Sequence, residues 1–312
     1  MRALALADWY EADLHVVHTG ASARAGGTDR IDLRGQLSAR GARLAQASGA
    51  GRVNIVPAVL PGRPVAAIAD YSRTVDADLV VVGKEPRRNH GYWLPGSFAT
   101  AVAKAVPATT MAIPQVSRQL ARRDGPFRNI VAAIDFSEAS LGALSQALAL
   151  AQQSGGRLTL LHVLTGFPYE SVYWGTHAFR LRRGFSAGID RINHALRSLI
   201  PSDAMNWADI DVATVTGNAG GAIVRAASDR RADLLVLGVP RRPRLEEVLA
   251  GTTVHGVVRR AVTPVLLVPG PSTANLFEPM HEHDLDFTPQ RALGWRPMRD
   301  PTARLEGDAS WQ

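Results

Sequence analysis

ADLVVVG at residues 77–83 and ADLLVLG at residues 232–238 are nearly the same seven residues, set 155 positions apart. The same shift carries other residues onto counterparts of the same type, namely Gly62 onto Gly217 and Pro114 onto Pro269. Solenoid proteins repeat every ~20–50 residues, so a repeat this long indicates a duplicated domain instead.

The second copy alternates strand-like and helix-like segments along its whole length. We expect strands at 129–135, 157–164, 209–217, 232–238 and 263–269, and helices at 137–154, 178–199, 219–231 and 251–262. This alternation predicts parallel βαβ units, and the continuous apolar runs LLVLG and VLLVP predict a sheet covered by helices on both faces. The fold class is therefore α/β, a doubly wound parallel-sheet sandwich with its ligand crevice at the carboxyl ends of the strands.

The first copy lacks its first strand. A helix-like segment at 2–13 leads directly into LHVVHTG at 14–20, which matches the second strand of the complete copy. The first strand of a doubly wound sheet is central, so its loss would leave two neighbouring strands without backbone partners. Two explanations stay open: translation begins upstream of Met1, or another segment fills the gap. A native mass that matches 312 residues would exclude the first.

The chain is expected to contain two tandem domains and a tail. The predicted parts are a first domain at 1–114, a polar linker at 115–126, a complete second domain at 127–269 and an irregular tail at 270–312. The tail holds aromatic residues that offer a docking surface, namely Phe277, Phe287, Trp295 and Trp311. Its His281 and His283 have the spacing of a metal clip, but no scaffold fixes their geometry, so we expect a solvated tail and no metal site.

Composition limits the function. The chain has 46% hydrophobic and 20% charged residues and no cysteine, which excludes disulfides, thiolate metal sites and thiol nucleophiles. No apolar run is long enough for a membrane span, so we expect a cytoplasmic protein. The net charge of +7 rests on 35 basic residues, of which only Lys84 and Lys104 are lysines. The arginines are scattered and accompany no recognised motif, so we expect no nucleic-acid partner.

Four segments carry a family resemblance: IVAAIDFSEAS (130–140), LTLLHV (158–163), ADLLVLG (232–238) and GTTVHGVVRRAVTPVLLVP (251–269). As an ordered set they resemble the universal stress protein family in its tandem form. The resemblance implies a binding or regulatory role in stress resistance. It also implies that the last strands, TMAI (110–113) and VLLV (265–268), pair as a pseudo-dimer within one chain. A homo-oligomer and an unidentified protein partner remain open.

Nucleotide-binding members of the family carry a Gly-x2-Gly-x9-Gly-(Ser/Thr) pattern, whose glycines let backbone N–H groups approach phosphates. The resemblance implies a site in the second domain made of Asp135, Val163, Gly217, Gly238, Gly251, Thr252 and Thr253. Arg241 replaces the middle glycine, although Arg241, Arg242 and Arg244 offer guanidinium groups to phosphates instead. The first domain keeps Gly83, Gly96 and Ser97 but has Pro86 at the middle position and no acid, so its site is degenerate.

Two functions therefore remain in competition. In the first, the second domain holds ATP or another adenine nucleotide with Mg²⁺. In the second, both sites are degenerate and the protein is an interaction module that acts through its sheet edges or tail. We expect no catalytic residues, because neither a Gly-x-Ser-x-Gly elbow nor a Walker motif is present, but slow ATP hydrolysis without a dedicated base stays open. The equivalent residues His18 and His162 are interpreted as structural.

Overall fold

The computed structural model describes residues 2–19, 28–49, 52–83, 97–114, 127–165, 178–240 and 250–270. The first unit contains α1 (Arg2–Trp9), β1 (Leu14–Thr19), α2 (Thr28–Ser48), β2 (Ile55–Leu60), α3 (Pro64–Thr74), β3 (Leu79–Gly83), α4 (Ser97–Ala105) and β4 (Thr109–Ile113). The second unit contains β5 (Asn129–Ala133), α5 (Glu138–Ser154), β6 (Arg157–Leu164), α6 (Ala178–Ser198), the short 3₁₀ helix η4 (Ala204–Asn206), β7 (Asp209–Thr216), α7 (Ala219–Asp229), β8 (Leu234–Val239), α8 (Ala250–Arg260) and β9 (Val265–Pro269). No helix in this described part combines the length and apolarity needed to span a bilayer.

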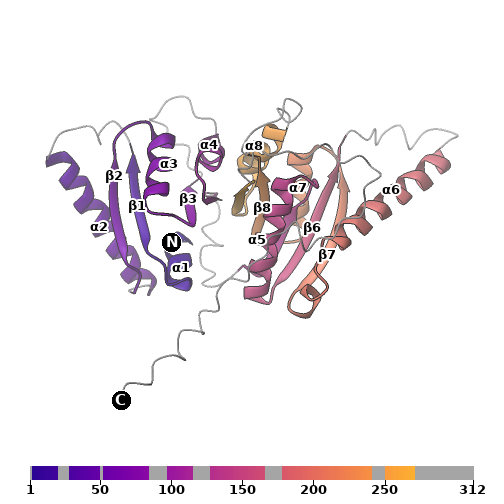
Figure 1. The fold of residues 1–312 in the computed structure, drawn as a ribbon, viewed down its shortest axis with the longest axis horizontal. Coiled ribbons are helices and arrows are strands. Elements are labelled where there is room, and N and C mark those ends of the chain that lie inside the picture. The colour runs from indigo at the N-terminus through magenta and orange to yellow at the C-terminus, as the bar shows by residue number, and fades with distance from the viewer. Residues whose placement is uncertain are drawn as a thin grey trace, which may run out of the picture.

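The second unit has the doubly wound order predicted for it. Its strands lie in the order β7-β6-β5-β8-β9, all parallel within the unit. Residues of α5 and α6 belong to one hydrophobic core, and residues of α7 and α8 belong to another, so helices cover both faces of the sheet (Figure 1). The burial of β5 agrees, since Ile130, Val131 and Ala132 are fully buried.

The duplication also appears in the backbone. Asp76 and Arg231 both adopt left-handed φ angles, 47° and 52°, immediately before the repeated ADL segment. Gly62 and Gly217 have φ angles of 106° and 131° at the turns after β2 and β7. Such angles strain residues with a Cβ, so the shared 155-residue shift of these positions shows that the two units use the same turns.

The first unit lacks its central strand, as predicted. β1 pairs with β2 in a separate two-stranded sheet, whereas β3 pairs with β4 at the end of the seven-stranded sheet. The position between β1 and β3 corresponds to the one that β5 occupies between β6 and β8 in the second unit. None of the described strands lies there. The expected fold class, two tandem doubly wound sandwiches with the first incomplete, is therefore confirmed.

The two units join through their last strands. β4 and β9 pair antiparallel, with Met111 opposite Leu266, which is the pairing expected from the family resemblance. β3 and β4 of the first unit thereby join the five strands of the second unit in one seven-stranded sheet, and two edges are covered. On one face, α1 packs onto the second unit: Leu6 shares a hydrophobic core with Phe127, and the Arg2 guanidinium lies 4.3 Å from the centre of the Phe127 ring.

Candidate functional site

Three strands of the second unit end at one edge of the sheet. Ala133 of β5 is in register with Leu161 of β6 on one side and with Leu237 of β8 on the other. The residues that follow these three therefore meet at the carboxyl edge, where doubly wound sheets bind their ligands. Three of the predicted site residues, Asp135, Val163 and Gly238, belong to these strand ends.

Asp135 is exposed and has one carboxylate oxygen without a partner in the described structure. Its Oδ1 accepts hydrogen bonds from the Ser137 backbone N–H at 3.0 Å and from the Ser137 hydroxyl at 2.5 Å. Ser137 in turn caps α5, because its Oγ accepts from the Ser140 N–H at 3.2 Å. Asp135 is thus held by the start of α5 while Oδ2 remains open to a ligand.

An aromatic residue that the sequence had not singled out lies beside this carboxylate. Phe136 has a φ of 63° and is 38% exposed, and its ring centre lies 5.3 Å from that of His162. The His162 Nδ1 donates a hydrogen bond to the Ile134 carbonyl at 2.8 Å, which ties β6 to the end of β5. This contact supports the structural role expected for His162.

Gly238 is needed for packing before any ligand is considered. A Cβ at this position would lie 2.2 Å from the Ala139 carbonyl carbon and 2.5 Å from the Ser140 nitrogen. The start of α5 therefore rests directly on β8, at a distance that only glycine permits. The family pattern attributes this glycine to phosphate binding, and the structure adds a second, independent reason for it.

Gly217 makes the turn from β7 into α7. Its N–H donates to the Leu164 carbonyl at 3.1 Å, next to Val163, and its φ of 131° suits only glycine. Asn218 then caps α7, with its Oδ1 accepting from the Gly221 N–H at 3.3 Å. Gly217 thus fixes where α7 begins, and it is Asn218 whose side chain enters the adjacent pocket.

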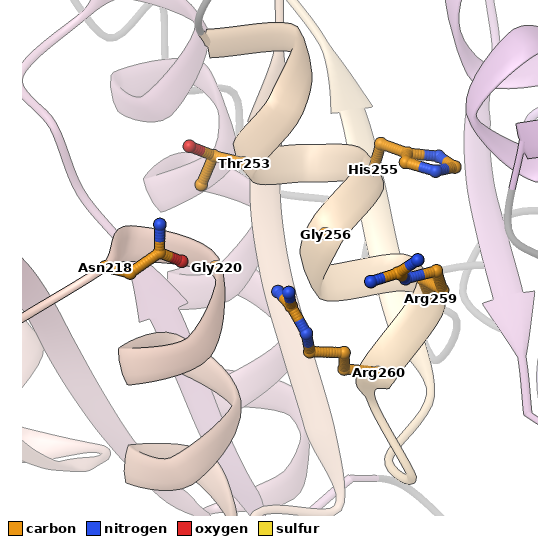
Figure 2. Close-up of a pocket in the computed structure, with 7 residues that line it drawn as sticks. All are labelled: Asn218, Gly220, Thr253, His255, Gly256, Arg259 and Arg260. Carbon is orange, nitrogen blue, oxygen red and sulfur yellow. The ribbon is translucent and has the colours of Figure 1, made fainter.

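A pocket of about 390 Å³ lies between α7 and α8. Its lining residues are Asn218, Gly220, Thr253, His255, Gly256, Arg259 and Arg260. Figure 2 shows Asn218 and Thr253 on opposite sides of this pocket, with the Arg260 side chain extending from α8 toward α7. The helices approach closely at Gly220 and Gly256, where an added Cβ would lie 3.4 Å and 3.2 Å from the Arg260 Nη1.

The pocket is cationic. None of the described residues that line it is acidic, and neither Arg259 nor Arg260 forms an ion pair with a carboxylate in that part of the chain. The start of α7 adds the partial positive charge of a helix N-terminus. The pocket holds a histidine, a threonine hydroxyl, an amide and two guanidinium groups that have no carboxylate partner among the described residues. Together these groups favour an anionic ligand.

The other predicted site residues divide into two groups. Gly251, Thr252 and Thr253 lie in the first turn of α8, where the family pattern expects a helix to begin, and Thr253 lines the cationic pocket. Arg241, Arg242 and Arg244 lie outside the described residues, as do Gly96, Pro86 and the histidines of the tail. No group of three or more histidine, aspartate or glutamate side chains in the described ranges is arranged to hold a metal ion.

Sequence analysis did not identify Asn218, Arg259 and Arg260 as residues of a binding site. Arginines at the end of a helix normally complement the helix dipole, so this pair carried no signal of a site. The available signal was the small-residue pair Gly220 and Gly256, which permits a close helix crossing and brings Arg260 to the start of α7.

The fold and the site define a tandem doubly wound α/β protein with a cationic pocket near the carboxyl edge of its complete unit. The sequence model of the universal stress protein family matches residues 1–114 and 126–269. The chain belongs to the universal stress protein family, whose members are stress-response proteins.

Solved structures share this architecture over most of the chain. A universal stress protein from Archaeoglobus fulgidus is 16% identical, with 87% of this chain and 92% of that one covered and a TM-score of 0.56. A functionally unknown protein from Pseudomonas aeruginosa is 18% identical, with 86% of each chain covered and a TM-score of 0.56. A universal stress protein in complex with cAMP is 25% identical over 46% of this chain and 98% of that one, at a TM-score of 0.34. Among curated protein sequences, none matches this chain.

Proposed function

We propose that the second unit binds one adenine nucleotide and that the protein acts as a nucleotide-responsive stress protein. The main support for this proposal is the cationic pocket beside the first turn of α8. The strand ends with Asp135, Val163 and Gly238 lie at the same carboxyl edge of the sheet. In this arrangement Asp135 and Val163 contact the nucleoside. The first turn of α8, with Gly251, Thr252 and Thr253, receives the phosphates, as helix N-termini commonly do. Mg²⁺ would be held mainly by the phosphates themselves.

The first test is to identify what the purified protein carries. The protein is isolated at moderate salt and denatured, and any released small molecule is identified by mass spectrometry. We expect ATP, ADP or AMP at up to one per chain, because only the second unit has an acid at the end of its first strand. Absence of nucleotide, together with no thermal shift on adding Mg-ATP, would contradict the proposal.

Asp135→Asn should weaken ATP binding by about ten- to a hundredfold, since a hydrogen bond to a charged group contributes about 1.5–3 kcal/mol. Asparagine keeps an oxygen that accepts from Ser137, so the start of α5 is preserved. Isothermal titration calorimetry measures the change. Asp203→Asn is the matched control, because Asp203 is exposed and its side chain makes no cap hydrogen bond. An unchanged affinity in Asp135→Asn would show that this carboxylate does not contact the nucleotide.

Arg260→Ala should lower the affinity for ATP while leaving that for adenosine unchanged, because its guanidinium would meet only the phosphates. Titrations with both ligands make the comparison. Arg157→Ala is the control, since Arg157 pairs with Asp209 at 2.7 Å at the amino end of β6, on the opposite edge of the sheet. Equal losses for ATP and adenosine would contradict the assignment of this pocket to the phosphates.

A further inference from the structure

The second unit differs from the first at positions that line the cationic pocket. The 155-residue shift pairs the pocket residues Gly220, Thr253, Gly256 and Arg260 with Val65, Phe98, Ala101 and Ala105, in that order. In the first unit, Val65 and Phe98 pack against a hydrophobic core. The second unit therefore has two glycines, a hydroxyl and a guanidinium group where the first has apolar side chains.

Two of these exchanges make room for a third. A Cβ added to Gly220 or Gly256 would lie 3.4 Å or 3.2 Å from the Arg260 Nη1, and the shorter distance is closer than ordinary van der Waals contact. The first unit has side chains at both positions and an alanine in place of the arginine. The two glycines thus let the Arg260 guanidinium lie over the crossing of α7 and α8 (Figure 2).

The described residues offer no acidic partner for this guanidinium group. Holding a long side chain in one place costs conformational entropy, which a contact has to offset. Neither Arg260 nor its neighbour Arg259 forms an ion pair with a carboxylate in the described part of the chain. An anionic ligand would supply the partner for both.

The polar groups of the pocket lie on two sides of α8. Figure 2 shows Thr253 and the Arg260 guanidinium on the side of α7, and His255 and Arg259 on the opposite side. An α-helix with its side chains is about 10–12 Å across, so these two sets of groups are too far apart for one small ion. A single phosphoryl group beside Arg260 would leave His255 and Arg259 without contact.

The size of the pocket agrees with a longer ligand. Its volume of about 390 Å³ has room for roughly a dozen water-sized groups, at about 30 Å³ each. An orthophosphate ion, with its single phosphorus, would fill less than half of this space. A chain of two or three linked phosphoryl groups would fill most of it.

We propose that the pocket binds an oligophosphate, a chain of two or more linked phosphoryl groups, and that the second unit thereby distinguishes a nucleoside triphosphate from a monophosphate. One phosphoryl group lies between Thr253 and Arg260, and the next ones extend toward His255 and Arg259. The preference for a triphosphate rests on the nucleotide binding proposed above, whereas the oligophosphate contact itself needs no nucleoside. Occupancy of the protein then follows the level of triphosphate and not that of monophosphate.

The first test uses no nucleotide. Inorganic triphosphate and orthophosphate are titrated separately into the full chain and followed by isothermal titration calorimetry. Inorganic triphosphate should bind at one per chain, and orthophosphate should bind about tenfold more weakly or less, because it makes fewer charge-assisted hydrogen bonds. Equal affinities, or no binding of inorganic triphosphate, would overturn the proposal.

The second test compares ATP, AMP and adenosine. ATP should bind about tenfold more tightly than AMP or better. Arg260→Ala, which introduces the residue of the first unit, should remove most of this preference by weakening ATP and leaving AMP unchanged. Arg197→Ala is the matched control, because Arg197 is an exposed arginine in the last turn of α6.

The outcomes separate this proposal from the proposed function. If AMP binds as tightly as ATP, or if Arg260→Ala weakens both equally, the oligophosphate assignment is wrong while nucleotide binding stands. If none of the three adenine compounds binds, the proposed function is wrong, and the titration with inorganic triphosphate still decides whether the pocket holds an oligophosphate.

Gly256→Ala tests the position of the guanidinium group without removing it. The new methyl group would lie 3.2 Å from the Arg260 Nη1 and would displace the end of this flexible side chain. The affinity for inorganic triphosphate should fall roughly two- to tenfold, the equivalent of one hydrogen bond. The melting temperature should not fall, because alanine is favoured over glycine in a helix. Gly142→Ala, on α5, is the control, since a Cβ there meets nothing within 4 Å. An unchanged affinity in Gly256→Ala would overturn the role assigned to Arg260.

Discussion

Gly238→Ala should lower the free energy of unfolding by about 3 kcal/mol, at the upper end of the range for overpacking a well-packed interior. The added methyl group would lie 2.2–2.5 Å from backbone atoms of Ala139 and Ser140, and backbone cannot move aside as a flexible side chain can. Relief would require α5 to lift away from β8, which would disturb Ser137 and Asp135 as well. Chemical denaturation, followed by circular dichroism, measures the loss.

The repeat provides a matched control for this substitution. Gly83 is the equivalent residue of the first unit, and a Cβ there meets nothing within 4 Å. Gly83→Ala should be neutral or stabilise the protein by up to about 0.5 kcal/mol, since glycine in a strand carries an entropic cost. If Gly238→Ala is as stable as Gly83→Ala, then the close contact between α5 and β8 does not exist in solution.

Asp233→Ala should destabilise the protein by about 2 kcal/mol, because two part-buried backbone donors lose a charged acceptor. Asp233 is 6% exposed, and its carboxylate oxygens accept from the Arg128 N–H and the Asn129 N–H, each at 3.0 Å. These bonds fasten the beginning of β5 to the beginning of β8. The shift of the denaturation midpoint gives the size of the effect.

Asp78 is the counterpart of Asp233 in the first unit, and it is exposed. Among the described residues, none donates a hydrogen bond to the Asp78 carboxylate as Arg128 and Asn129 do to that of Asp233. Asp78→Ala should therefore change stability by less than about 0.5 kcal/mol, as exposed substitutions usually do. A similar loss in both variants would mean that Asp233 acts through something other than the start of β5.

Much of the fold could be predicted from local pattern. The strands and helices of the second unit appear where apolar runs and helical periodicity placed them, and Ser137 caps α5 as its side chain suggests. The repeat predicted the incomplete first sheet, because aligning the two copies showed which strand had no counterpart. The pairing of β4 with β9 could not be derived from periodicity and was predicted only through the family resemblance, whereas its antiparallel direction comes from the structure.

Fewer residues of the candidate site than elements of the fold could be predicted from the sequence. Asp135, Val163 and Gly238 were nominated through the family resemblance, and the register of β5, β6 and β8 brings their strand ends to one edge of the sheet. Phe136 was overlooked because its exposure follows from a left-handed backbone angle, which no pattern of apolar residues reveals. Arg260 was overlooked because it lies two turns beyond the family pattern, at the far end of α8.

The kind and order of the elements follow from the chain itself, because apolar periodicity, helix caps and turn glycines act over a few neighbouring residues. The internal duplication and the missing strand are equally visible there, since they need only a comparison of the chain with itself. Two features follow only from the tertiary structure. Gly238 must be glycine because α5 packs directly against it, and Arg260 reaches the start of α7. Both depend on how closely two separate elements approach, a distance set by the packing of the whole unit and not by the residues on either side.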